Sequence, residues 1–165
     1  MYNVLIADDE DMIREGLKCL LDWESLGFCV AGEASNGEEA YHQTLNLKPD
    51  VVLMDIRMPG MLGLDVIRKV REEGFEGKIM ILSGYSDFHY AQEAIHYGVQ
   101  DYLTKPIDED ELTNSLLSLK SQLDATRASR DTADHYRQKA HDTIVEDILT
   151  GEYPKVCVNL QTDVR

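Results

Sequence analysis

Three aspartates follow short apolar runs of the sequence. Asp8 and Asp9 come directly after residues 4–7, and Asp55 comes directly after residues 51–54. Carboxylates that are packed together repel each other, and a divalent cation is the usual relief. A ligand set made of oxygen atoms alone favours a hard ion such as Mg²⁺, which also binds phosphate oxygens. We therefore expect Asp8, Asp9 and Asp55 to form a Mg²⁺ site that receives a phosphoryl group.

A hydroxyl group and an ammonium group extend this chemistry. Ser83 and Lys105 each follow a further apolar run. A carboxylate beside a cation can attack phosphorus and become an acyl phosphate, and it needs no general base because it is already deprotonated. A lysine can neutralise charge on the transferred group, and a hydroxyl can donate a hydrogen bond to its oxygens.

The elements that position these residues alternate along the chain. Apolar runs bounded by turn residues predict strands that are buried on both faces of a sheet, at residues 4–7, 28–31, 51–54, 79–82 and 101–104. A helical spacing of apolar residues follows each run, near residues 13–21, 36–48, 64–73, 91–97 and from 108 onward. This order predicts an α/β fold, a doubly wound, five-stranded parallel sheet of the flavodoxin-like (βα)5 type. Ligands of such folds lie at the carboxyl ends of the strands, where the polar residues occur.

The pattern changes after residue 123. Residues 124–150 lack proline and glycine and keep a rough helical spacing, so we expect an extended C-terminal helix that acts as a linker toward a missing output domain. A helix that continued to residue 149 would span about 60 Å, and we expect so long a helix to be paired with another chain or frayed. Residues 151–165 show no pattern, and we expect a loosely ordered tail.

Composition excludes several classes of protein. The chain has 16 Lys and Arg against 31 Asp and Glu, a net charge of −15, which argues against a broad nucleic-acid surface within these residues. No apolar run approaches the roughly 18 residues of a membrane span, and the start lacks the pattern of a signal peptide. Cys19, Cys29 and Cys157 lack metal-type spacing, and we expect the first two to be reduced thiols in or near the core. We therefore expect a cytoplasmic protein.

Each feature also has an ordinary structural explanation. Acidic residues favour a helix N-terminus, and Asp55, Ser83 and Lys105 could each belong to a turn or loop, as Tyr102 could belong to the core. The functional interpretation rests on their joint occurrence at the ends of alternate elements, which independent turns would not produce.

Four segments contain the candidate site residues: LIADDE at 5–10, VLMDIRMPG at 52–60, LSG at 82–84 and DYLTKP at 101–106. With these segments, residues 1–123 resemble a response-regulator receiver domain of a two-component system. Three further segments are similar to those of the regulators that have an AraC-type helix-turn-helix output domain. They are DWESLGF at 22–28, SGYSDF at 83–88 and GVQDY at 98–102.

This resemblance implies the chemistry at the phosphorylation site. Asp55 would be the phosphoacceptor for a sensor histidine kinase. Mg²⁺ would be held by Asp8, Asp9, Asp55 and the backbone carbonyl of Arg57. Lys105 would contact the phosphoryl group.

The resemblance also implies a switch. Ser83 would contact the phosphoryl group and act with Tyr102 as the switch pair, and the peptide bond between Lys105 and Pro106 is expected to be cis. Phosphorylation would bias a surface formed by the helix at 91–97, the strand at 101–104 and the helix from 108 onward, a surface that often forms a symmetric homodimer in relatives. The signal would pass along the C-terminal helix to transcription control. DNA binding would belong to an output domain outside these residues.

Three alternatives compete with a signalling switch. An aspartyl-phosphate phosphatase or mutase would place a second acid two residues after the nucleophile, where this chain has Arg57, so we expect no enzyme. A flavin-binding module would need a phosphate-cradling loop after the first strand, and the acidic residues 8–11 would repel that phosphate. A phosphorylation-dead interaction domain is disfavoured by the intact set of site residues.

Overall fold

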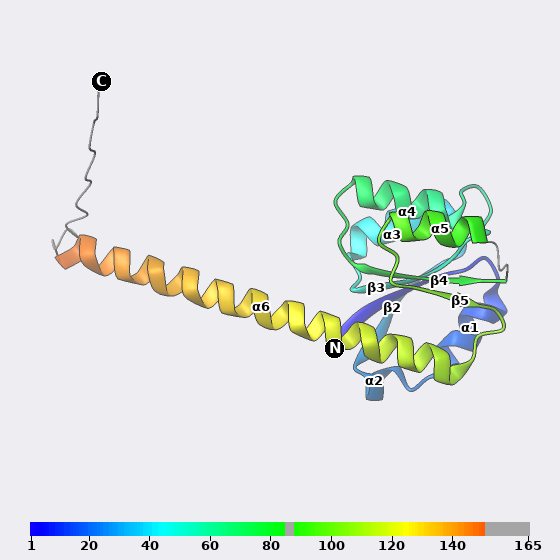
Figure 1. Cartoon of the computed structure of the whole chain (residues 1–165), viewed down its shortest axis with the longest axis horizontal. Coiled ribbons are helices and arrows are strands. Elements are labelled where there is room, and N and C mark those ends of the chain that lie inside the picture. The colour runs from blue at the N-terminus through cyan, green and yellow to red at the C-terminus, as the bar shows by residue number, and fades with distance from the viewer. Residues whose placement is uncertain (85–87, 151–165) are drawn as a thin grey trace, which may run out of the picture. The chain divides into compact units, whose positions relative to one another are not determined.

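The computed structural model describes residues 1–84 and 88–150 (Figure 1). The predicted tail at 151–165, Cys157 and part of the segment at 83–88 lie outside the described residues. The chain divides into two units, Met1–Leu123 and Asp124–Arg165.

Strands and helices alternate through the first unit. The elements are β1 Tyr2–Ala7, α1 Asp11–Leu20, α2 Trp23–Leu26, β2 Phe28–Ala34, α3 Gly37–Leu47, β3 Val51–Asp55, α4 Gly63–Glu72, β4 Lys78–Ser83, α5 Phe88–His96, β5 Asp101–Thr104 and α6 Glu109–Thr150. The strands form one parallel sheet in the order β2-β1-β3-β4-β5. The predicted doubly wound (βα)5 fold is confirmed.

The strand order reverses beside β1, and this reversal opens the carboxyl edge of the sheet. The chain runs from β1 to β2 on one side and then returns to place β3 on the other side of β1. Ala7 pairs with Met54, and Asp55 pairs with Leu82, so the residues that follow these strands meet at one edge. Ligands of parallel sheets bind at such a reversal because the flanking connections diverge there.

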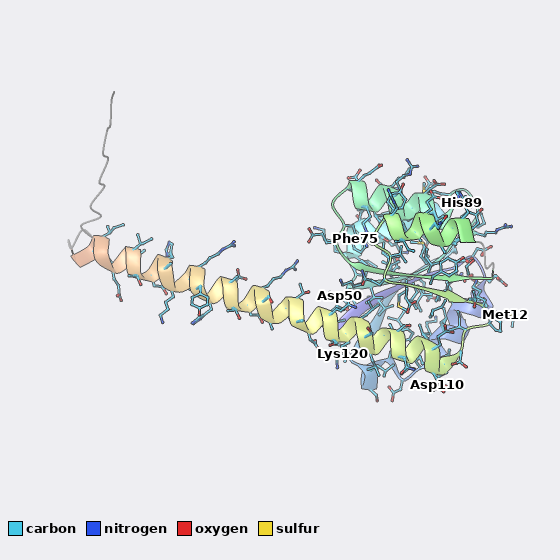
Figure 2. All side chains as sticks on the ribbon, viewed as in Figure 1. Met12, Asp50, Phe75, His89, Asp110 and Lys120 are labelled. Atoms are coloured by element: carbon cyan, nitrogen blue, oxygen red, sulfur yellow. The ribbon has the colours of Figure 1, made fainter. Side chains whose placement is uncertain are left out.

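Helices cover both faces of the sheet (Figure 1). Successive strand residues point to opposite faces. Val4 and Ile6 pack with residues of α1, α2 and the first turns of α6, whereas Leu5 and Ala7 pack with residues of α3, α4 and α5. All five residues of β3 are buried. Figure 2 shows side chains filling the layers on both sides of the sheet.

Helix α6 is continuous over 42 residues, which confirms the extended C-terminal helix. Leu112, Leu116 and Leu119 are buried in the core of the first unit. Beyond residue 123, every side chain that the structure describes is exposed. No helix in the described part of the chain has both the length and the apolar content needed to cross a membrane.

The structure corrects two details of the sequence analysis. Cys19 and Cys29 are free cysteines but are exposed, so the prediction that they lie in or near the core was wrong. Cys19 lies two residues, about 200° of helical rotation, from the buried Leu17. Cys29 alternates with the buried Phe28 on β2, an edge strand. The sequence analysis also missed helix α2, a single turn whose start is capped by the side chain of Asp22.

Candidate functional site

The predicted site residues lie at the carboxyl edge of the sheet. Asp8 directly follows β1, Asp55 ends β3 and Ser83 ends β4, and all three are buried. Lys105 directly follows β5. Because the four strands are parallel, their ends bring together side chains that are up to 97 residues apart in the chain.

Lys105 is the cation at the centre of this edge. Its Nζ atom lies 2.5 Å from Oδ2 of Asp8, 3.7 Å from Oδ2 of Asp55 and 4.0 Å from Oε1 of Glu10. Burial alone would lower the pKa of Lys105, but the hydrogen bond to Asp8 and the charges of Asp55 and Asp8 raise it overall. Lys105 therefore remains an ammonium group, surrounded by carboxylates.

Asp55 is a carboxyl group that resists ionisation. Its pKa is raised from 3.8 to about 6, chiefly because burial removes water from the charged form. The negative charges of Asp8 and Asp9 raise it further, whereas Lys105 and the backbone N–H of Ile56 oppose the rise. A cation placed beside these carboxylates would favour the ionised form of Asp55, which is the form that can act as a nucleophile.

The acidic turn after β1 is the candidate metal centre. Carboxylate oxygens of Asp8, Asp9 and Glu10 lie within 4.8 Å of one another. An open depression of about 240 Å³ adjoins the turn, and its lining residues are Asp9, Glu10, Asp55, Arg57, Gly84 and Lys105. Oxygen donors at this spacing, beside an open space for water and phosphate, fit Mg²⁺. Glu10, which the sequence analysis did not include among the predicted ligands, belongs to this group of converging carboxylates, and its place in the acidic run 8–11 was a signal; the predicted ligand Asp55 is not a member of the group.

The loop between β3 and α4 folds closely around Asp55. The N–H of Gly63 donates to the carbonyl of Ile56 at 2.7 Å. A Cβ atom on Gly63 would lie 2.1 Å from the backbone oxygen of Asp55, so this approach requires glycine. Arg57 is exposed in this loop and lines the depression.

The predicted switch residues differ in their distance along the chain from the lining residues, because Ser83 directly precedes Gly84, which lines the depression, and Tyr102 lies three residues before Lys105. Ser83 is buried, and its carbonyl accepts the N–H of Lys105 at 2.7 Å. Tyr102 is partly buried and packs against the core on the α3, α4 and α5 side of the sheet. The peptide bond between Lys105 and Pro106 is cis.

Comparison with known proteins agrees with this architecture. Residues 4–117 match the family model described as response regulator receiver domain. The transcriptional regulatory protein YesN of Bacillus subtilis is 38% identical over 158 residues, covering 92% of this chain and 43% of YesN. The transcriptional regulatory protein HptR of Staphylococcus aureus is 34% identical over 170 residues, covering 99% of this chain and 62% of HptR. The chain thus spans roughly half the length of these relatives.

Solved structures show the same fold. The receiver domain of AraT, a response regulator from Geobacillus stearothermophilus, is 40% identical, with a TM-score of 0.72 over 76% of this chain and 98% of that domain. A chain of the CheX–CheY complex with BeF3 and Mg²⁺ from Borrelia burgdorferi is 26% identical, with a TM-score of 0.66 over 72% of this chain and 88% of that chain. The protein belongs to the response regulator receiver family, and its site lies where the strand order of that fold reverses.

Proposed function

We propose that Asp55 accepts a phosphoryl group from a phosphohistidine of a sensor histidine kinase, and that this chain is a signalling switch. The observation that carries the proposal is a buried carboxyl group that lies near both an ammonium group and an acidic turn, at the wall of an open depression. The raised pKa of Asp55 and the 3.7 Å distance to Lys105 fit a nucleophile that is ionised when a cation balances its neighbours.

The transfer requires little covalent chemistry from the protein. An oxygen of the Asp55 carboxylate forms a bond to phosphorus, the bond from phosphorus to nitrogen breaks, and the imidazole leaves with the electron pair. Lys105 balances the charge on the phosphoryl oxygens, and the hydroxyl of Ser83 donates a hydrogen bond to one of them. Asp8, Asp9, Asp55 and the backbone carbonyl of Arg57 would hold Mg²⁺, which supplies further charge neutralisation. The similarity to a chain of the CheX–CheY complex, which contains BeF3 and Mg²⁺, supports this assignment.

The phosphorylated state would act through the surface made by α5, β5 and α6. Ser83 ends β4 next to β5, which carries Tyr102, so a displacement of Ser83 toward a phosphoryl group frees space beside that strand. We propose that this favours a homodimer through α5, β5 and α6, and that α6 passes the signal to an output domain. The curated relatives are named transcriptional regulators, so we place the DNA contacts in that domain and the protein in the cytoplasm, where bacterial DNA lies.

An aspartyl-phosphate phosphatase or mutase is the competing function. Such an enzyme needs an acid near the nucleophile to protonate a leaving group. The residue two positions after Asp55 is Arg57, which lines the depression and has no carboxylic acid to serve in this role. We therefore propose that the chain does not turn over external phosphate esters. A steady-state assay with such an ester tests this, and turnover that depends on Asp55 would favour the enzyme.

Direct phosphorylation tests the main proposal. Incubation with Mg²⁺ and a small phosphodonor should add the mass of one phosphoryl group to the intact protein. Asp55→Asn should prevent the addition, whereas Asp65→Asn, which changes an exposed carboxylate on α4, should leave it unchanged. Equal modification of wild type and Asp55→Asn would contradict the assignment, as would an unmodified wild type. Sedimentation of the phosphorylated protein then tests the homodimer, and an unchanged mass would contradict it.

A further inference from the structure

The guanidinium group of Arg14 contacts the backbone of the acidic turn formed by residues 8–10. The proposed phosphorylation chemistry does not use this group. Arg14 lies on α1, and its side chain is mostly buried. Its Nη1 atom donates to the backbone carbonyl of Asp8 at 2.7 Å, and its Nε atom lies 3.3 Å from Oε1 of Glu33. Its Nη2 atom donates to Asp11. The planar guanidinium group thus joins the turn to α1 and to β2, a geometry that an ammonium group cannot reproduce.

Each polar atom of Asp8 has a partner in this arrangement. The backbone N–H of Asp8 donates to the carbonyl of Ala34 at 3.0 Å, which continues the pairing of β1 with β2. Oδ1 accepts the N–H of Glu10 at 2.9 Å, and Oδ2 accepts from Lys105 at 2.5 Å. Arg14 holds the backbone carbonyl. That carbonyl belongs to the peptide plane between Asp8 and Asp9, so Arg14 fixes the direction in which the chain enters the acidic turn.

We propose that Arg14 is a positioning residue for the metal centre, and this inference rests on the proposed function. By fixing the peptide between Asp8 and Asp9, Arg14 keeps the carboxylates of the turn converged within 4.8 Å of one another. Residues that orient metal ligands without touching the metal commonly change metal affinity by about 10- to 100-fold when they are replaced.

Lys18 on the same helix offers a matched control. Its Nζ atom lies 2.9 Å from Oε2 of Glu33 and 2.6 Å from Oε1 of Glu15. Lys18 therefore shares the acidic partner Glu33 with Arg14, and both lie one or two turns into α1. The contacts of Lys18 are to these two glutamates, whereas those of Arg14 include the backbone of Asp8.

A positioning role for Arg14 and a purely electrostatic role predict changes in Mg²⁺ affinity of opposite sign when Arg14 is replaced. Removal of a positive charge near the acidic turn increases the net attraction for a cation, so charge alone predicts tighter Mg²⁺ binding for both Arg14→Gln and Lys18→Gln. Loss of the anchor on the Asp8 carbonyl predicts weaker binding for Arg14→Gln alone. The two substitutions remove the same charge and introduce the same side chain, so the comparison isolates the anchor.

The test is a Mg²⁺ titration of the full chain by calorimetry, using wild type, Arg14→Gln, Arg14→Lys and Lys18→Gln. We expect Arg14→Gln to weaken Mg²⁺ binding by about tenfold or more, Lys18→Gln to bind as wild type or more tightly, and Arg14→Lys to lie between wild type and Arg14→Gln. Equal affinities for Arg14→Gln and Lys18→Gln would overturn the proposal. Arg14→Lys keeps the charge, so it still provides the comparison if Arg14→Gln does not fold.

Hydrogen exchange in the metal-free protein separates this inference from the proposed function. The amides of Asp9 and Glu10 should exchange faster in Arg14→Gln than in Lys18→Gln, because the turn has lost its anchor. Unchanged exchange would overturn the role of Arg14. A wild type that does not bind Mg²⁺ would contradict the proposed function, and the exchange rates would still decide whether Arg14 orders the turn.

Discussion

The ammonium group of Lys105 lies closer to Asp8, at 2.5 Å, than to Asp55, at 3.7 Å. Asp8 is therefore neutralised directly by Lys105, whereas Asp55 is neutralised at a longer distance and carries the raised pKa. A cation added at the acidic turn would compete with the ammonium group for Asp8. This competition would free Lys105 to contact a phosphoryl group on Asp55.

Replacement of Lys105 by methionine should destabilise the metal-free protein. The side chain of Asp8 is 2% exposed, and removal of one partner from such a buried pair costs about 3 kcal/mol. Mg²⁺ should restore more stability to Lys105→Met than to wild type, because the metal no longer competes with the ammonium group. Urea unfolding with and without Mg²⁺ measures this, with Lys139→Met, a change at an exposed lysine, as the control. An equal Mg²⁺ effect in wild type and Lys105→Met would contradict the competition.

The ion pair between Lys105 and Asp8 should make the free energy of unfolding decrease at alkaline pH. The pKa of Lys105 is raised above 10.5 in the folded state, because its partnership with Asp8 and Asp55 outweighs burial. The folded state then binds the proton more tightly than the unfolded state, so the stabilisation is present below pH 10.5 and is lost as pH rises through the folded value. The stability difference between wild type and Lys105→Met should therefore shrink at alkaline pH. A constant difference would show that Lys105 acts through packing.

Asp55→Asn should stabilise the metal-free protein at neutral pH. The folded pKa of Asp55 is about 6 against an ordinary 3.8, so the folded state holds more protons between these values and stability falls as pH rises through them. Above pH 6 the cost of the ionised group is fully present and corresponds to at most about 3 kcal/mol. Denaturation from about pH 4 to pH 7 in a chelator measures the difference between Asp55→Asn and wild type. The difference in stability should grow across this window, and a flat difference would contradict the raised pKa of Asp55.

Gly63→Ala should both destabilise the fold and disturb Asp55. The added methyl group would lie 2.1 Å from the backbone oxygen of Asp55, so the loop between β3 and α4 must move, at a cost of about 1–3 kcal/mol. The control is Gly16→Ala on α1, where a methyl group meets no atom within 4 Å and should stabilise the helix by up to about 1 kcal/mol. The midpoint temperature of thermal unfolding and the affinity for Mg²⁺ should both be lower in Gly63→Ala than in wild type. If Gly63→Ala and Gly16→Ala behaved alike, the close approach would be wrong.

Arg71→Met should destabilise the fold, because Arg71 binds backbone carbonyls at the end of the sheet opposite to the site. Arg71 donates to the carbonyls of Phe75, Gly77 and Tyr97 at 2.7–3.0 Å, and it packs against the ring of Phe75, which is labelled in Figure 2. Loss of a charged donor from partly buried carbonyls should cost about 2 kcal/mol. Arg68→Met, at an exposed arginine three residues earlier, should change stability by less than about 0.5 kcal/mol. Urea midpoints for the two variants provide the comparison, and equal midpoints would contradict this role.

The sequence was sufficient for the fold because its strands are simple to recognise. The run at 101–104 matches β5, and the runs at 51–54 and 79–82 fall within β3 and β4. These strands are apolar because the sheet is covered on both faces. The expected strand at 28–31 was too short, because Gly32, Glu33 and Ala34 are recruited to β2 by pairing with Leu5, Ile6 and Ala7 rather than by their own propensity.

Some features of the site follow from the order of residues along the chain, and others depend on tertiary contacts. The sequence by itself determined that Asp8, Asp55, Ser83 and Lys105 end or follow parallel strands, and such ends must share one edge of the sheet. Only the tertiary structure decided that Lys105 pairs with Asp8 more closely than with Asp55, that Glu10 joins the carboxylates of the acidic turn, and that Arg14 holds the Asp8 carbonyl. Strand periodicity fixes the side of the sheet on which a residue lies. The direction of a long side chain depends on what packs around it, and that information comes from distant parts of the chain.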